Sequence, residues 1–145
     1  MNLGLVAVAF GLTAALYGRL ANPFPAHWDG HGEVNGWAPK PWGPFYLPLL
    51  MAGMSLFFDV VRRSAARRTA SGSIGVALDV IGAALVAFLL LLDVAALSAS
   101  LGHSLAMKRV VYAGCGLLFV VVGNVLGKLR RNFFAGIRTP WTLAS

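Results

Sequence analysis

The sequence has 145 residues, of which 58% are hydrophobic and only 12% are charged, and its mean hydropathy is +0.74. Because soluble domains carry about a quarter charged residues, this balance excludes an ordinary soluble domain and predicts an integral membrane protein. The formal net charge of +7 would suit nucleic-acid binding, but the basic residues lie in short segments between apolar runs. We therefore expect these cations to meet membrane lipid, and no nucleic acid.

Four apolar segments are predicted to cross the membrane as helices, so the expected fold is an all-α integral membrane protein. Their expected bounds are 3–20, 45–61, 76–100 and 110–126. Each approaches the roughly 20 residues that a helix needs to span the hydrocarbon core. The first segment lacks a basic n-region and is long for the apolar part of a signal peptide, so we expect it to be retained.

Small residues on two of these segments predict close helix packing. Gly4, Gly11 and Gly18 recur every seven residues and share one face, and Gly123 and Gly127 form a GxxxG pair. Such faces let another helix approach closely. They suit a helix-packing partner, a homo-oligomer or a structural role in a larger membrane complex.

The segment 21–44 is predicted to be an ordered extracytoplasmic loop, because its prolines and glycines disfavour a helix. Three of the four tryptophans lie in it, as suits a membrane–water boundary. Polar side chains that suit ligand binding alternate with them. The candidate ligand-binding residues are His27, Trp28, Asp29, His31, Glu33, Asn35, Trp37 and Lys40.

Within this loop, His27 and His31 are also weak candidates for a metal site. Imidazole is a common metal ligand, but no HExxH pattern or cysteine pair accompanies them. The alternative is that the loop's imidazoles and carboxylates satisfy its own backbone groups. The single cysteine, Cys115, lies in an apolar run where a thiolate is disfavoured, so we predict no nucleophile and no cofactor.

Two carboxylates interrupt the third apolar segment. Asp79 and Asp93 are fourteen residues apart, so they point roughly the same way and lie about 21 Å apart along a helix. That separation excludes a shared-proton pair. We expect both to be buried and to face the bundle interior, because an ionised carboxylate is costly in lipid. Either hydrogen bonds from neighbouring helices or a functional role would explain them.

The distribution of Lys and Arg predicts the orientation of the spans. The connection after the second span and the segment 127–145 carry four each, and the opposite side carries Arg19, Lys40, Lys108 and Arg109. Eight cations against four place both termini in the cytoplasm, with 127–145 as a basic cytoplasmic tail. The sequence predicts a single membrane domain over residues 1–145.

Two stretches together resemble the SdpI family of bacterial membrane proteins. The first comprises Gly123-Asn124, Gly127-Lys128 and Asn132, followed by Gly-Ile-Arg-Thr-Pro-Trp-Thr-Leu over 136–143. The second is the loop over 25–40, with Pro25, His27-Trp28 and Trp37, which is similar to an uncharacterised domain that often precedes the SdpI region. Asp29 stands where that domain usually has Asn. The family pattern usually continues into further spanning helices, whereas this sequence ends at Ser145.

The resemblance implies a toxin-immunity or signal-sensing role without catalysis, in the bacterial cytoplasmic membrane. It implies a peptide toxin as the partner outside and a cytoplasmic regulator inside. Partner or lipid contact is then expected for Asn124, Lys128, Asn132, Arg138, Thr139 and Trp141. Two alternatives stay open. One is an interfacial enzyme or transporter for a lipid-like substrate that uses His27, Asp29, His31 and Glu33, and the other is a structural subunit.

Overall fold

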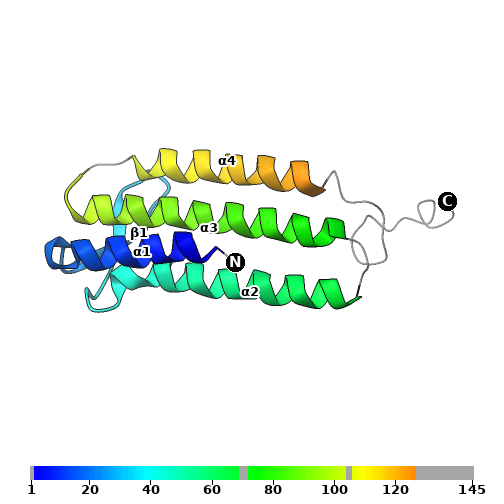
Figure 1. The fold of residues 1–145 in the computed structure, drawn as a ribbon. Coiled ribbons are helices and arrows are strands. Elements are labelled where there is room, and N and C mark those ends of the chain that lie inside the picture. The colour runs from blue at the N-terminus through cyan, green and yellow to red at the C-terminus, as the bar shows by residue number, and fades with distance from the viewer. Residues whose placement is uncertain (1, 69–71, 104–105, 127–145) are drawn as a thin grey trace.

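The computed structural model describes residues 2–68, 72–103 and 106–126, which form a helical bundle with a β-hairpin at one end (Figure 1). Its α-helices are α1 Leu3–Leu16, α2 Tyr46–Arg68, α3 Gly72–Ser100 and α4 Met107–Leu126. Two 3-10 turns, η1 Tyr17–Arg19 and η2 Gly43–Phe45, lie on either side of the hairpin strands β1 Phe24–Trp28 and β2 Val34–Ala38.

Successive helices run in opposite directions, so α1 and α3 both point toward the hairpin (Figure 1). Together α1 and η1 cover Leu3–Arg19, about 25 Å of helix at 1.5 Å per residue. The 29 residues of α3 cover about 43 Å. Because α1 begins partway along the bundle, α2 and α3 extend beyond it toward the connection that joins them.

Within the described part of the chain, three helices are long and apolar enough to cross a membrane: Gly43–Ala65, Ile74–Ser100 and Met107–Leu126. The structure is therefore mostly helical and fits an all-α type of membrane protein. The helix α2 continues through Arg68, beyond residue 61 where the second span is expected to end. Arginine and alanine are good helix formers, so leaving an apolar environment does not end the hydrogen-bonded helix.

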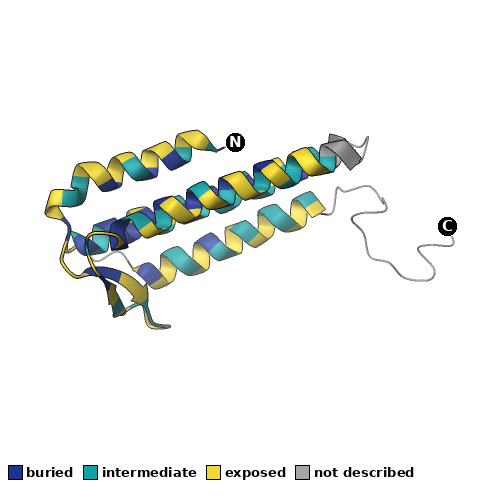
Figure 2. Cartoon of the chain, turned by 90° about the horizontal axis from the view of Figure 1, so that it is seen from below, coloured by how far each residue is buried: buried dark blue, intermediate teal, exposed yellow. Residues whose placement is uncertain are grey.

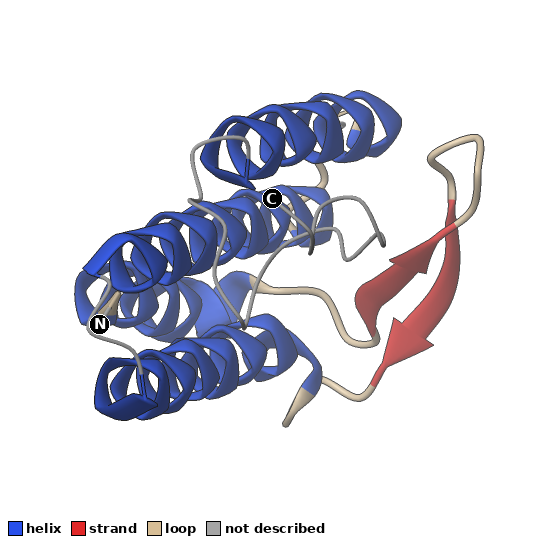
Figure 3. Cartoon of the chain, turned by 90° about the vertical axis from the view of Figure 1, so that its right-hand side faces the viewer, coloured by secondary structure: helices blue, strands red, loops and turns tan. Residues whose placement is uncertain are grey.

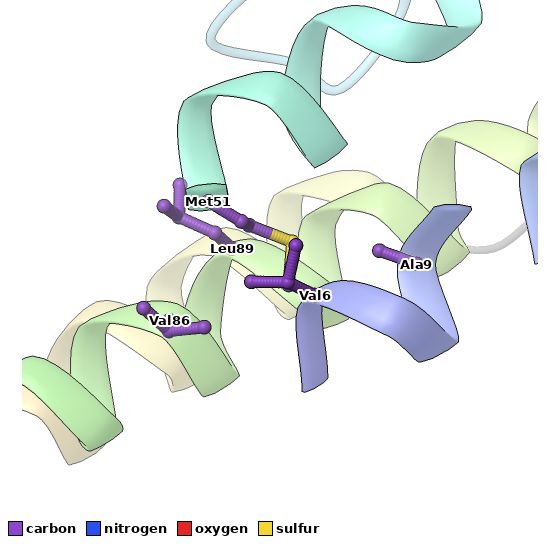
Figure 4. Close-up of a cluster of buried hydrophobic side chains, with 5 residues drawn as sticks. All are labelled: Val6, Ala9, Met51, Val86 and Leu89. Atoms are coloured by element: carbon purple, nitrogen blue, oxygen red, sulfur yellow. The ribbon is translucent and has the colours of Figure 1, made fainter. Parts of the chain in front are cut away.

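The bundle core lies where α1, α2 and α3 meet. Figure 4 shows Val6 and Ala9 of α1 against Met51 of α2, with Val86 and Leu89 of α3 beside them. The small side chain of Ala9 is fully buried, which lets α1 lie close to its neighbours. Many other large apolar residues are exposed, and Figure 2 shows exposed positions in yellow along all four helices. In a membrane protein such an outer face meets lipid.

The segment between α1 and α2 adds one element that was not expected, a two-stranded antiparallel sheet, to the otherwise helical structure (Figure 3). The strand register pairs Phe24 with Ala38 and Trp28 with Val34, and irregularities flank the pair of His27 with Gly36. A Cβ at position 36 would lie 2.8 Å from the His27 Cβ, so this pairing requires glycine. Strands were not expected because the density of proline and glycine outweighed the short β-forming runs.

Candidate functional site

The base of the hairpin is fixed to the ends of the helices by apolar packing. Leu20 and Phe24 are buried against Ala96 and Leu97 on α3, and Trp28 packs on the same cluster. Burying these side chains removes apolar surface from water. The hairpin therefore has a defined position at this end of the bundle.

Two hydrogen bonds secure the chain on both sides of the hairpin. The backbone N–H of Ala21 donates to Ser100 Oγ at the end of α3, at 2.9 Å. Lys40 Nζ donates to the carbonyl oxygen of Leu20 at 2.7 Å and lies 5.3 Å from the centroid of the Tyr17 ring. Lys40, a predicted ligand-binding residue, thus has partners within the fold.

Asp29 organises the turn at the tip of the hairpin. Its Oδ1 accepts the backbone N–H groups of His31 at 2.8 Å and Glu33 at 3.1 Å, as Asx turns do. Gly32 has φ +90°, a conformation that residues with a Cβ rarely adopt. The hydrogen bond from the Glu33 backbone, followed by that from His31, lowers the pKa of Asp29 below its ordinary value. Asp29 therefore shapes the turn as an ionised group.

The two histidines have different surroundings. The His27 ring on β1 pairs with Asn35 Oδ1 on β2, a contact across the strands, whereas His31 is exposed in the turn. No group of three or more His, Cys, Asp and Glu side chains suited to a metal occurs among the described residues. The structure thus gives His27 a partner within the hairpin, and its role toward a metal stays untested.

A groove separates the hairpin tip from the region where α3 ends and α4 begins. It has a volume of about 580 Å³, and its charged and polar lining side chains are His31, Glu33, His103, Lys108 and Arg109. Its two walls approach closely at Gly32, where an added Cβ would lie 3.2 Å from Lys108 Cβ. The structure therefore brings His31 and Glu33 together with three residues that the sequence did not indicate as site residues, His103, Lys108 and Arg109.

The remaining predicted ligand residues occupy different faces of the hairpin. Trp37 on β2 is 59% exposed, whereas Trp28 on β1 is half-buried in the apolar cluster at the base. An exposed tryptophan on a fixed strand presents a large rigid surface, the type of residue that dominates many binding interfaces. Of the hairpin's aromatic residues, Trp37 is thus the better placed to meet a ligand.

The opposite end of the bundle corrects the expectation for Asp79, which is not buried. Its side chain is 57% exposed, and its Oδ1 lies 3.3 Å from Arg62 Nε on α2. The physical reason is its position in the early part of α3, the end of that helix that extends beyond the start of α1 (Figure 1). There the Asp79 carboxylate pairs with Arg62 of the neighbouring helix and lies outside the bundle interior.

Asp59 on α2 was missed by the sequence analysis, although it is the more buried carboxylate of this group. Its side chain is 6% exposed, and it contacts Arg62 at 3.0 Å and Arg63 at 2.7 Å. The spacings of three and four residues put all three on one side of the helix. That spacing is the signal for this cluster in the sequence, where the two arginines also indicate the end of a span.

Asp93 lies in the bundle interior with 1% of its surface exposed. Along α3 it falls between the buried Leu89 and the buried Ala96, and one of its oxygens has no hydrogen-bond partner in the described structure. Thr13 of α1 is also fully buried and lacks a hydroxyl partner among the described residues. A buried carboxylate without a cation is expected to be protonated in lipid.

The predicted partner-contact residues fall mostly outside the described residues. Asn124 lies near the end of α4 and is exposed. The others are Lys128, Asn132, Arg138, Thr139 and Trp141. Their expected contacts with partners or lipid stay predictions.

Two comparisons with known proteins give matches. A family model described as "Domain of unknown function (DUF1648)" matches residues 4–52, which include α1 and the hairpin. Immunity protein SdpI of Bacillus subtilis (strain 168) is 24% identical over 139 residues, or 96% of this chain. The match covers 64% of that protein, so this chain spans less than two thirds of its length. No solved structure gives a significant match.

Proposed function

We propose that this chain, which is similar to Immunity protein SdpI, is an immunity-type membrane protein that recognises a peptide toxin without catalysis. The observation that carries this proposal is the similarity to Immunity protein SdpI along 96% of the chain. Neither alternative, an interfacial enzyme or transporter or a structural subunit, gains support from the comparisons.

In this proposal, α1 with η1 is a fourth span, and both termini lie in the cytoplasm of a bacterial cell. The antiparallel course of the helices supports this arrangement, because it places the hairpin at one end and the connection between α2 and α3 at the other (Figure 1). The Lys and Arg count, eight against four, favours the connection end as the cytoplasmic one. The hairpin would then face outward.

The hairpin is the proposed toxin-binding surface. It is held by a buried apolar base and by hydrogen bonds at both ends, so little conformational entropy remains to be lost on binding. Trp37 provides an exposed aromatic anchor, with His31 and Glu33 at the tip. The basic segment 127–145 would meet lipid headgroups or a regulator on the cytoplasmic side.

The direct test is protection of a sensitive cell. The chain is expressed in a Bacillus subtilis strain that lacks its own Immunity protein SdpI, and growth is measured in dilutions of culture supernatant from the parent strain. Protection relative to an empty vector is expected. Trp37→Ala should reduce the tolerated dose about 10-fold or more if Trp37 is an anchor.

Trp42→Ala is the matched control, because Trp42 is similarly exposed, at 55%, but lies outside the strands. It should leave protection nearly unchanged. If the chain reaches the membrane in normal amounts and still gives no protection, the immunity role is contradicted.

A further inference from the structure

The groove between the hairpin tip and α4 carries an excess of positive charge. Of its charged lining residues, Lys108 and Arg109 are cations and Glu33 is an anion. Neither cation forms an ion pair within the described residues. The carboxylate of Asp29 stands nearby, but it is already occupied by two backbone N–H groups. Lys108 Nζ lies 5.9 Å from the centroid of the Tyr112 ring, a contact that leaves its charge without an anionic partner among the described residues. The groove can therefore accept an anion.

The start of α4 adds hydrogen-bond donors to the same groove. Ala106 accepts the first helical hydrogen bonds, from the N–H groups of Arg109 and Val110, and its methyl group cannot cap the helix. The first N–H groups of a helix lack partners within it and favour anions. Ala106 and Met107 line the groove together with the imidazoles of His31 and His103, which supply further polar atoms.

A second, apolar groove follows the same pair of helices. It has a volume of about 250 Å³ and is lined by side chains such as Phe88 and Leu91 of α3 and Leu118 of α4. Ala99 in the first groove and Phe88 in the second are eleven residues apart, which is close to three full helical turns. Met107 and Leu118 have the same separation. The two grooves thus lie along one seam, one above the other.

A cationic groove above an apolar one matches an amphiphile with an anionic head better than it matches a soluble peptide. The charged groove also lies where one candidate membrane span finishes, at Ser100, and the next begins, at Met107. Phospholipid headgroups are found at this depth, just outside the hydrocarbon core. We infer that the seam between α3 and α4 binds an anionic phospholipid, its phosphate in the groove beneath the hairpin tip and an acyl chain along the apolar groove. Such a lipid would brace the hairpin tip, and this inference does not depend on the immunity role.

Native mass spectrometry of the full chain in detergent tests the inference by titration with phosphatidylglycerol and with phosphatidylcholine of identical acyl chains. The chain should bind phosphatidylglycerol more tightly. Lys108→Gln and Arg109→Gln should each weaken that binding about 5-fold, and the double variant about 25-fold. Glu33→Gln should strengthen it, because the negative charge in the groove is removed.

Arg19→Gln is the matched control, because Arg19 is exposed at the same end of the bundle but does not line the groove. It should leave binding unchanged. The single variants and the opposite effect of Glu33→Gln keep the test decisive even if the double variant folds poorly. Equal affinity for both lipids, or no loss in the two single variants, overturns the inference.

Two soluble competitors test whether free phosphate or a peptide occupies the charged groove in place of a lipid. Inorganic phosphate should not displace phosphatidylglycerol at equal concentration, since it cannot use the apolar groove. A hexaglutamate peptide should also fail to displace it. Displacement by phosphate would contradict binding of an acyl chain in the apolar groove. Displacement by the peptide would indicate that the charged groove binds a peptide and not a lipid.

Discussion

The two ends of the apolar helix bundle provide partners for their polar side chains in different ways. At the hairpin end, side chains bond mainly to the backbone: Asp29 holds the turn, Lys40 holds Leu20, and Ser100 accepts from Ala21. At the connection end, charged side chains bond to one another, with Arg62 between Asp59 and Asp79. The first arrangement fixes the shape of a segment, whereas the second joins two helices and fixes no loop.

This difference indicates where each end is vulnerable. The hairpin depends on a few buried apolar contacts at its base, because its strands bury little by themselves. The connection end depends on close approach of α2 and α3, where Phe58 lies against Gly82. Changes at the two ends should therefore have separable effects, the first on the hairpin and the second on helix packing.

The largest expected effect comes from Phe24→Ala at the hairpin base. Phe24 is 4% exposed, and its removal leaves a cavity against α3, which should cost about 3 kcal/mol of stability. The unfolding midpoint in detergent should fall, and amide exchange should rise throughout the hairpin. Trp37→Ala is the control and should change stability by less than about 0.5 kcal/mol. Normal amide protection in Phe24→Ala would show that the base does not hold the hairpin.

A smaller effect is expected from Gly82→Val on α3. A Cβ at this position would lie 2.9 Å from Phe58 Cγ, so the helices must separate or the ring must move, at a cost of about 2 kcal/mol. The hairpin should keep its amide protection while the unfolding midpoint falls. Gly53→Val on α2 is the matched control, because a Cβ there meets nothing within 4 Å. Equal destabilisation by both variants would contradict the close approach.

The smallest effect is a pH dependence confined to the hairpin turn. Because backbone hydrogen bonds lower the pKa of Asp29 below 3.8, its stabilisation is present above that ordinary value and is lost as the pH falls through the folded pKa. Amide protection of His31 and Glu33 should therefore decrease below about pH 4. Asp29→Asn keeps an acceptor oxygen and should abolish this acid sensitivity. An unchanged pH profile in Asp29→Asn would contradict the role of the carboxylate.

The helical part of the structure could be predicted well from the sequence, and its polar contacts could not. Apolar runs of about twenty residues indicate helices regardless of their partners, since the length requirement belongs to the membrane. The expected segment 76–100 accordingly overlaps α3 almost completely. Whether a carboxylate within such a run is buried depends on neighbouring helices, so Asp93 and Asp79 received the same prediction and have opposite exposures.

The candidate site shows the same division. Residues 21–44 could be identified as a polar, tryptophan-containing connection because composition is a local property. The strand register, with Gly36 opposite His27, and the groove that joins His31 and Glu33 to Lys108 arise from contacts between distant parts of the chain. Hydrophobicity and charge are properties of single residues and short runs, so the apolar helices and the membrane-type composition could be recognised from the amino-acid sequence alone. Which polar groups meet depends on how the helices and the hairpin pack, so these contacts become known only from the folded arrangement.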